Sequence, residues 1–286
     1  MDGFIATNQY MDSRQFQIAV RRLANSLGFG ADRSAALGPG LEYVQSRPYA
    51  PGDPVKSIDW RVTARTRKFH VKEYEAPRRL PAYLLIDTSA SMTIQSAKHS
   101  KYETAIFIAG GLALACLDRI SPVGVLGVGE STLHVRPSLS RETVLGWLHR
   151  LRTYNCNEPT KLASRVAQLA PQLAERTLLI VLSDLHEPES LPVLKSLAQR
   201  HDCVVLQFRD PAERGLSGAG WLRAREAETG RTMVSRGGVK WSDPEAIASE
   251  LQRGAIHHLL IDVDQPYVPR LRHFFRSRGI LGQGTR

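Results

Sequence analysis

From residue 80 onward, short apolar runs alternate with longer segments in which apolar residues recur at helical spacing. The runs at 80–86 and 177–183 carry few polar residues, which is typical of parallel strands buried on both faces. Further runs predict strands at 123–129, 132–136, 203–208 and 258–263, and a hairpin at 221–235. The segments with helical spacing predict helices at 102–117, 141–151, 162–173, 192–201, 244–253 and 267–278. This alternation predicts an α/β fold with a three-layer, doubly wound, mostly parallel sheet.

The chain before residue 80 follows a different pattern. A helix is predicted at 16–27 and, after a glycine-containing loop, short strands at 41–49 and 69–74. Residues 61–79 are the most basic stretch, with seven Lys or Arg and two Glu. We therefore predict three parts: an N-terminal arm or small β subdomain (1–79), the α/β domain (80–278) and a flexible tail (279–286).

The composition is that of a globular protein, since 42% of the 286 residues are hydrophobic and 23% are charged. A formal net charge of +10 favours an anionic partner: nucleic acid, anionic lipid or an acidic protein face. No recognisable nucleic-acid-binding motif accompanies this charge. The longest apolar stretch, 105–117, is shorter than the roughly 20 residues that span a bilayer, and we recognise no signal peptide. We expect a soluble, cytoplasmic protein with reduced, buried cysteines.

Two of the expected buried strands end in a carboxylate, Asp87 and Asp184. In doubly wound sheets, ligands bind at the carboxyl ends of the strands where the strand order reverses, so we expect these side chains to lie close together. Ser89 and Ser91 follow Asp87 at alternate positions of a loop, and Thr160 lies in a loop before a helix. Such an all-oxygen set suits Mg²⁺ or Mn²⁺ and does not suit zinc.

This order of residues resembles the metal-ion-dependent adhesion site of von Willebrand factor A domains. The resemblance lies in Asp-x-Ser-x-Ser after a buried strand, a later loop threonine and a later strand-ending aspartate. It implies that Ser89, Ser91 and Thr160 supply hydroxyls and that Asp87 and Asp184 bind the ion directly or through water. It also implies that a carboxylate of a protein partner completes the metal shell.

Other interpretations of the hydroxyl residues stay open. The family often has glycine before the threonine, where this chain has Pro159, and Thr153 is a possible substitute. Thr160 could instead cap the following helix. Ser89 and Ser91 could hydrogen-bond to backbone groups of their loop.

A segment upstream of Asp87 resembles the hallmark of the family called "domain of unknown function 58". It reads Gly52-Asp-Pro-Val-Lys-Ser-Ile-Asp-Trp60, preceded by Arg47-x-Tyr49 and followed by Ala64-Arg65 and Val71-Lys72. The turn Glu228-Thr-Gly230 and the closing helix to Arg278 are also similar, so the resemblance covers about residues 40–278. It implies a bacterial protein that acts with a MoxR-type AAA+ ATPase.

Four basic residues lie upstream of the strand that delivers Asp87: Arg61, Arg65, Arg67 and Lys68. They are either a solvated face or a contact surface, and we predict them as partner-binding residues.

We predict no catalytic residue, because the site lacks an evident general base and the sequence has no G-x-S-x-G elbow and no Walker A loop. Ser89 stands where an aspartyl-phosphate phosphatase would carry its second carboxylate. The function we predict is metal-dependent protein–protein interaction, as an adaptor or chaperone-like partner of a MoxR-type AAA+ ATPase. The alternatives are a nucleic-acid binder that uses the basic arm, and a metal-dependent hydrolase.

Overall fold

The structure, a computed structural model, describes residues 13–28, 42–75, 80–130, 133–214, 221–225, 232–236 and 243–277. Contacts divide the chain into two compact units. Among the described residues, the larger unit contains 13–28 and those from 80 to 277, and the smaller unit contains 42–75.

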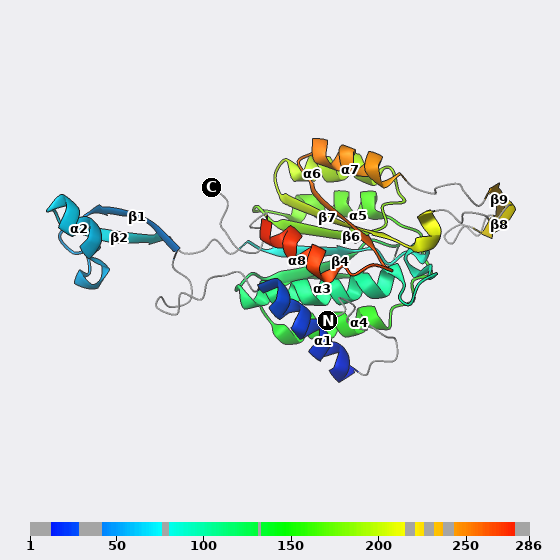
Figure 1. Ribbon diagram of the computed structural model, residues 1–286, viewed down its shortest axis with the longest axis horizontal. Coiled ribbons are helices and arrows are strands. Elements are labelled where there is room, and N and C mark those ends of the chain that lie inside the picture. The colour runs from blue at the N-terminus through cyan, green and yellow to red at the C-terminus, as the bar shows by residue number, and fades with distance from the viewer. Residues whose placement is uncertain are drawn as a thin grey trace. The chain divides into compact units, whose positions relative to one another are not determined.

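A six-stranded sheet forms the centre of the larger unit (Figure 1). Its strands are β3 (Ala82–Ile86), β4 (Val123–Gly127), β5 (His134–Ser138), β6 (Leu178–Ser183), β7 (Asp202–Arg209) and β10 (His257–Asp262). Their order is β10-β7-β6-β3-β4-β5, and the pairing of β4 with β5 is antiparallel while the others are parallel. The chain runs from β3 to one edge and then returns to β6, so the strand order reverses beside β3.

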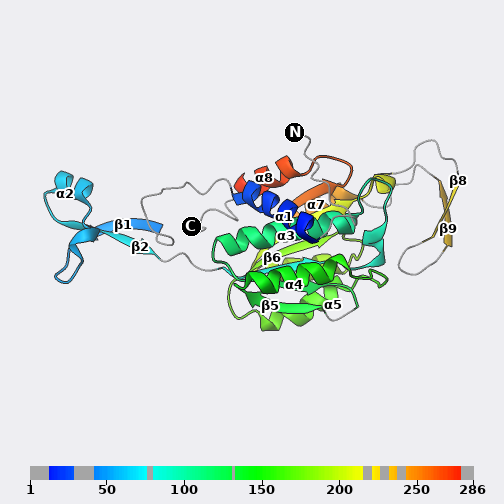
Figure 2. The same cartoon turned by 90° about the horizontal axis from the view of Figure 1, so that it is seen from below.

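Helices cover both faces of this sheet (Figures 1 and 2). One face carries α1 (Ser13–Gly28), α3 (Lys101–Asp118), α4 (Arg141–Arg152) and α8 (Val268–Ser277), and the other carries α5 (Leu162–Leu169), α6 (Ser190–Ala198) and α7 (Pro244–Arg253). Successive side chains of a strand point to opposite faces, so Leu84 and Ile86 pack in one core while Tyr83 and Leu85 pack in the other. The predicted α/β fold with a mostly parallel sheet between helices is confirmed.

Helix α1 packs on α3 and belongs to the larger unit, although we predicted residues 1–79 as one separate part. Phe16 and Leu23 are buried in the core that α3 lines. At this contact α3 has glycines, and a Cβ on Gly111 would lie 2.5 Å from Cδ2 of Leu23. The amphipathic pattern of α1 therefore serves the α/β core, which a local sequence pattern does not reveal.

In the smaller unit, β1 (Glu42–Pro48) pairs antiparallel with β2 (His70–Glu75). Helix α2 (Trp60–Thr66) lies between them in sequence and was not predicted. Asp59 caps α2, because its Oδ1 accepts hydrogen bonds from the N–H groups of Arg61 and Val62 at 3.1 and 3.2 Å. Among the described apolar side chains of this unit, Ile58 and Val71 are the buried ones.

Three further features complete the described chain. Strands β8 (Trp221–Arg225) and β9 (Thr232–Arg236) form the antiparallel hairpin that we predicted. Cys116, Cys156 and Cys203 are buried free thiols, as expected. Among the described ranges, no helix has the length and apolar character needed to cross a bilayer.

Candidate functional site

Asp87 and Asp184 lie at the same edge of the central sheet. Asp87 directly follows β3 and Asp184 directly follows β6, and these strands are parallel neighbours with Ile86 opposite Leu182. The N–H of Asp87 donates to the carbonyl of Leu182 at 2.9 Å, so the backbone pairing of β3 with β6 extends as far as Asp87. This edge is also where the strand order reverses, which is the expected place for a ligand site.

The two serines meet these carboxylates through a short 3-10 helix, η2 (Ala90–Thr93), that follows β3. The hydroxyls of Ser89 and Ser91 lie 3.0 Å apart. The Ser91 hydroxyl donates to Oδ2 of Asp184 at 2.8 Å, and the N–H of Ser89 donates to Oδ1 of Asp87 at 3.1 Å. Four of the five predicted metal ligands therefore form one contiguous, buried group of oxygens.

Thr160 is buried in the loop between α4 and α5. This loop is joined to η2 by the N–H of Ala90, which donates to the carbonyl of Glu158 at 2.9 Å. Lys161 takes the N-cap position of α5, so Thr160 is not the cap. The possible substitute, Thr153, is exposed at the end of α4, where its hydroxyl donates to backbone carbonyls.

Asp87 is fully buried and takes part in no ion pair among the described side chains. Its partners are Ser89, through both its N–H and its side chain, and the hydroxyl of Ser183, which donates to Oδ2 at 2.5 Å. Burial, followed by the nearby charge of Asp184, raises the pKa of Asp87 to about 7. A buried carboxylate without a counter-ion is costly, so a cation bound here would stabilise the ionised form.

Lys101 is the counter-ion of Asp184, and sequence reasoning missed it. It is the first residue of α3 and is fully buried, which is rare for lysine unless it is paired. Its ammonium donates to Oδ2 of Asp184 at 2.7 Å and also to Oε1 of Glu213 on the 3-10 helix η4 (Pro211–Arg214). Burial alone would lower the pKa of Lys101, but these two carboxylates raise it.

The charge of Lys101 also fixes the state of Asp184. Burial by itself opposes ionisation of Asp184, but the adjacent Lys101 and His186 hold its pKa below the usual value. The two aspartates therefore differ in electrostatics, because Asp184 is compensated and Asp87 is not. Asp184 brings less free negative charge to a metal ion than the sequence led us to expect.

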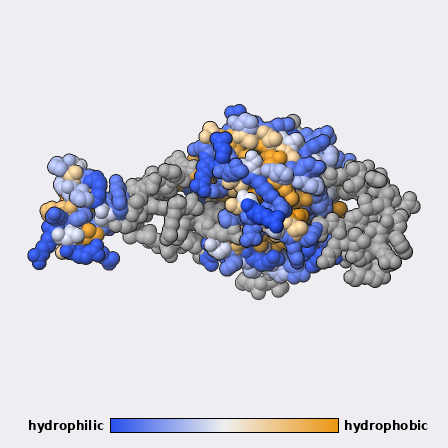
Figure 3. Space-filling view, turned by 90° about the horizontal axis from the view of Figure 1, so that it is seen from above, coloured by the Kyte–Doolittle hydropathy of each residue, from blue (hydrophilic) through white to orange (hydrophobic). Residues whose placement is uncertain are grey.

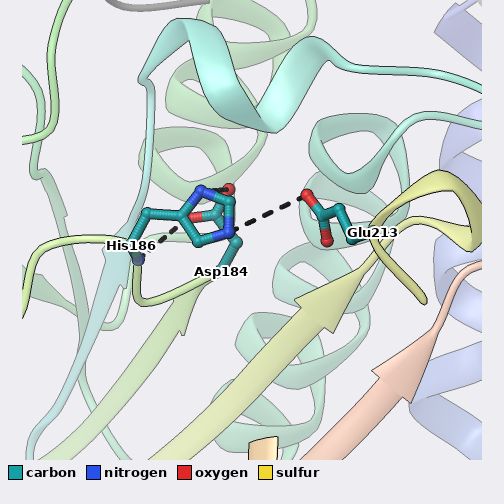
Figure 4. A group of neighbouring side chains, drawn as sticks. All are labelled: Asp184, His186 and Glu213. Atoms are coloured by element: carbon teal, nitrogen blue, oxygen red, sulfur yellow. Dashed lines mark hydrogen bonds and ion pairs between the residues drawn. The ribbon is translucent and has the colours of Figure 1, made fainter. Parts of the chain in front are cut away.

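Asp184, His186 and Glu213 form a second group with metal-ligand chemistry (Figure 4), and their ligand atoms lie within 4.8 Å of one another. Nδ1 of His186 is 3.6 Å from Oδ2 of Asp184, and Nε2 is 3.9 Å from Oε1 of Glu213. These are the same two oxygens that accept from Lys101. The lysine ammonium thus occupies the cationic position of this triad, and a metal ion would have to displace it.

The oxygen group around Asp87 fits a hard divalent cation better than the triad does. It offers carboxylate and hydroxyl oxygens only, which are the ligands of Mg²⁺ and Mn²⁺. It also has one carboxylate that no ammonium neutralises, whereas both carboxylates of the triad share Lys101. We therefore assign the candidate cation position to Asp87, Ser89 and Ser91, with Asp184 at its border.

A second layer of hydrogen bonds holds the site loops in place. The Thr88 hydroxyl donates to Oε1 of Glu158 at 2.6 Å and accepts from the N–H of Gly129 at 3.1 Å. The Tyr154 hydroxyl also donates to Oε1 of Glu158, at 3.0 Å. A Cβ on Gly129 would lie 2.0 Å from the same oxygen, so a larger residue there would displace the Glu158 carboxylate. Sequence reasoning missed Glu158 because its partners are distant in sequence.

The predicted partner-binding residues lie in the smaller unit. Arg61 and Arg65 are on α2, and Arg67 and Lys68 lie between α2 and β2. All four side chains are exposed.

Comparison with known proteins gives a family but no activity. Residues 45–239 match the family described as "Protein of unknown function DUF58". Uncharacterized proteins of Mycobacterium bovis (strain ATCC BAA-935 / AF2122/97) and Mycobacterium tuberculosis (strain ATCC 25618 / H37Rv) are 26% identical over 250 residues, which is 86% of this chain and 77% of each relative. A crystal structure of the Deinococcus radiodurans RO (RSR) protein aligns with 71% of this chain at 15% identity and a TM-score of 0.35, and this chain covers 35% of that protein.

Proposed function

Because the chain belongs to the DUF58 family, whose function is unknown, we propose a function from the site itself: metal-dependent binding of a protein partner. The ion would be Mg²⁺ or Mn²⁺, held by Asp87, Ser89 and Ser91, with Asp184 and Thr160 completing the protein side of its shell. This chain's carboxylates and hydroxyls bind and orient the ion. When bound, the ion supplies a Lewis-acidic position that accepts a carboxylate from the partner.

The observation that carries this proposal is the state of Asp87. It is a buried carboxylate at the sheet edge, without a counter-ion among the described side chains and with two hydroxyls within its immediate surroundings. Buried charges in proteins are paired or coordinate metals. Divalent cation binding accounts for this residue better than a purely structural role does, since a structural role would be served as well by a neutral side chain.

The placement of the site supports the finer assignment to the von Willebrand factor A type. The sheet order, the reversal beside β3 and the Asp-x-Ser-x-Ser sequence at the carboxyl end of β3 agree with the resemblance. The adaptor or chaperone-like role and the MoxR-type AAA+ ATPase partner come from the family resemblance alone. Arg61, Arg65, Arg67 and Lys68 are exposed basic residues that an anionic partner would contact.

The first test is isothermal titration of Mg²⁺ and Mn²⁺ into chelator-treated protein. Acetate is added as a stand-in for the partner's carboxylate. We expect binding by the wild type and no binding by Asp87→Asn, which keeps the shape of the side chain and removes its charge. Asp118→Asn, on the exposed ion pair with Arg21, is the matched control and should bind as the wild type does. No binding by the wild type in acetate would contradict the metal site.

The second test addresses the partner. A MoxR-type ATPase co-expressed with this chain should co-purify with it, and chelation by EDTA or the Asp87→Asn substitution should abolish co-purification. Association that survives both treatments would contradict metal-dependent binding.

We expect no turnover of phosphate esters. Metal-dependent turnover that Asp87→Asn abolishes would instead favour the hydrolase alternative.

A further inference from the structure

The smaller unit exposes three large aromatic side chains. Tyr49, Trp60 and Phe69 have relative exposures of 39%, 63% and 59%. Large apolar side chains grouped on a surface mark a place where another molecule binds. Figure 3 shows hydrophobic and hydrophilic residues side by side on the surface of this unit.

Backbone pairing brings these three residues to one end of β2. The N–H of Tyr49 donates to the carbonyl of Phe69 at 2.9 Å, and the two ring centroids are 6.5 Å apart. On the other side of β2, Ile58 bridges Val71 in antiparallel register, and the N–H of Asp59 donates to the carbonyl of His70 at 2.8 Å. The backbone of Trp60 therefore lies near the Phe69 end of β2, on the side of that strand that does not pair with Tyr49.

Four uncompensated positive charges lie close in sequence to Trp60 and Phe69. None of the side chains of Arg61, Arg65, Arg67 and Lys68 forms an ion pair with a described residue, and all are exposed. The acidic side chains described in this unit are used internally. Asp53 forms a two-point pair with Arg47, Asp59 caps α2 and accepts from Ser46, and Glu73 accepts from Gln45. Among the described side chains of this unit, the exposed charge is therefore mainly positive.

We propose that the smaller unit binds single-stranded nucleic acid, with bases stacking on the exposed rings of Tyr49, Phe69 and Trp60 and phosphates contacting the four basic residues. Exposed rings beside exposed cations are the recurring composition of single-strand binding surfaces, because every base has a face that stacks and every linkage carries a negative charge. An acidic protein face is the competing ligand. Protein interfaces also enrich arginine and aromatic residues, so the observation that favours the nucleic acid is the run of four exposed cations without an ion pair to a described side chain, which suits a polyanion.

The test uses the full chain and a fluorescent oligothymidylate of about 15 nucleotides, followed by anisotropy at about 50 mM salt. We expect Trp60→Ala to weaken binding about tenfold, since stacking on one base accounts for a change of that order. Trp60→Phe should retain most of the affinity. Leu139→Ala removes an exposed apolar side chain of the larger unit and should change nothing.

The charged half of the surface is tested by salt dependence. The double variant Arg65→Gln/Lys68→Gln should lower the slope of log affinity against log salt by about 1.4, at about 0.7 per phosphate contact on a single strand. Arg141→Gln, exposed on α4, is the control and should leave the slope unchanged.

Three results would overturn the proposal. The first is an unchanged affinity of Trp60→Ala. The second is a duplex of the same length that binds as tightly as the single strand, since its bases are not free to stack. The third is displacement of the oligonucleotide by polyglutamate at equal charge, which would assign the surface to an acidic protein. Binding that persists in EDTA and in Asp87→Asn separates this surface from the proposed metal site.

Discussion

Replacing Lys101 by methionine probes the charge balance of the site. The substitution keeps an unbranched side chain in the fully buried position and removes the ammonium. Asp184 and Glu213 would then lie in the interior without their shared cation. Removing one partner of a buried ion pair typically costs about 3–5 kcal/mol, because the remaining charge is left uncompensated. We expect a loss of about 3 kcal/mol, at the lower end of that range.

The loss should depend on pH. In the wild type the pKa of Asp184 is lower in the folded state than in the unfolded state. Ionised Asp184 therefore stabilises the fold above its unfolded-state pKa, and this stabilisation is lost as pH falls through its folded-state pKa. Without Lys101 that favourable interaction disappears, and burial then disfavours the ionised carboxylates. The variant should therefore lose most stability at pH 8, and the difference from the wild type should shrink in acid.

Urea unfolding of the metal-free protein, followed by circular dichroism, measures this effect at pH 8 and pH 5. Lys98→Met, at an exposed lysine in the same loop region, is the control and should be within about 0.5 kcal/mol of the wild type. The assignment of Lys101 as the counter-ion would be refuted if Lys101→Met lost no more unfolding free energy than Lys98→Met does. It would also be refuted if the loss for Lys101→Met were the same at both pH values.

Further predictions concern Asp87 and the contact of α1 with α3. The pKa of Asp87 is raised to about 7, so the native state of the wild type loses stability as pH rises towards and through that value. Asp87→Asn lacks this loss, so its free energy of unfolding relative to the wild type should be higher at pH 8 than at pH 5. Urea unfolding of the metal-free proteins measures this difference. Mn²⁺ at about 100 times its dissociation constant should raise the wild-type free energy of unfolding by about 2.7 kcal/mol and leave Asp87→Asn unchanged. Gly111→Ala should cost about 1–3 kcal/mol because its Cβ meets Leu23, whereas Gly146→Ala on α4, where a Cβ meets nothing within 4 Å, should not destabilise; thermal melts compare the two.

The central sheet could be predicted because its strands are buried on both faces. Such strands appear as short apolar runs, and the carboxylates that follow β3 and β6 lie at one edge by the geometry of parallel neighbours. The contact between Ser91 and Asp184 agrees with that expectation. Asp87, Ser89, Ser91 and Asp184 could therefore be grouped from the sequence alone.

The electrostatics of the site could not be predicted in the same way. A lysine at the first turn of a helix ordinarily points to solvent, and the burial of Lys101 depends on Asp184 and Glu213, which lie 83 and 112 residues away in sequence. The sequence pattern therefore suggested two equivalent aspartates, where the structure has one compensated and one uncompensated carboxylate. The docking of α1 was missed for a similar reason, since an amphipathic face does not specify its partner.

The packing of α1 on α3 has a consequence for the modular build of the chain. Because α1 and β3 both belong to the larger unit, residues 42–75 are an insertion tethered at two points and not a terminal appendage. Deleting everything before Leu80 would strip a helix from the core and expose the α3 glycines together with Phe107. Excising only the insertion, with a short linker from Gly28 to Leu80, should leave the α/β core intact. The two units can therefore be separated genetically only by a cut on both sides of the smaller one.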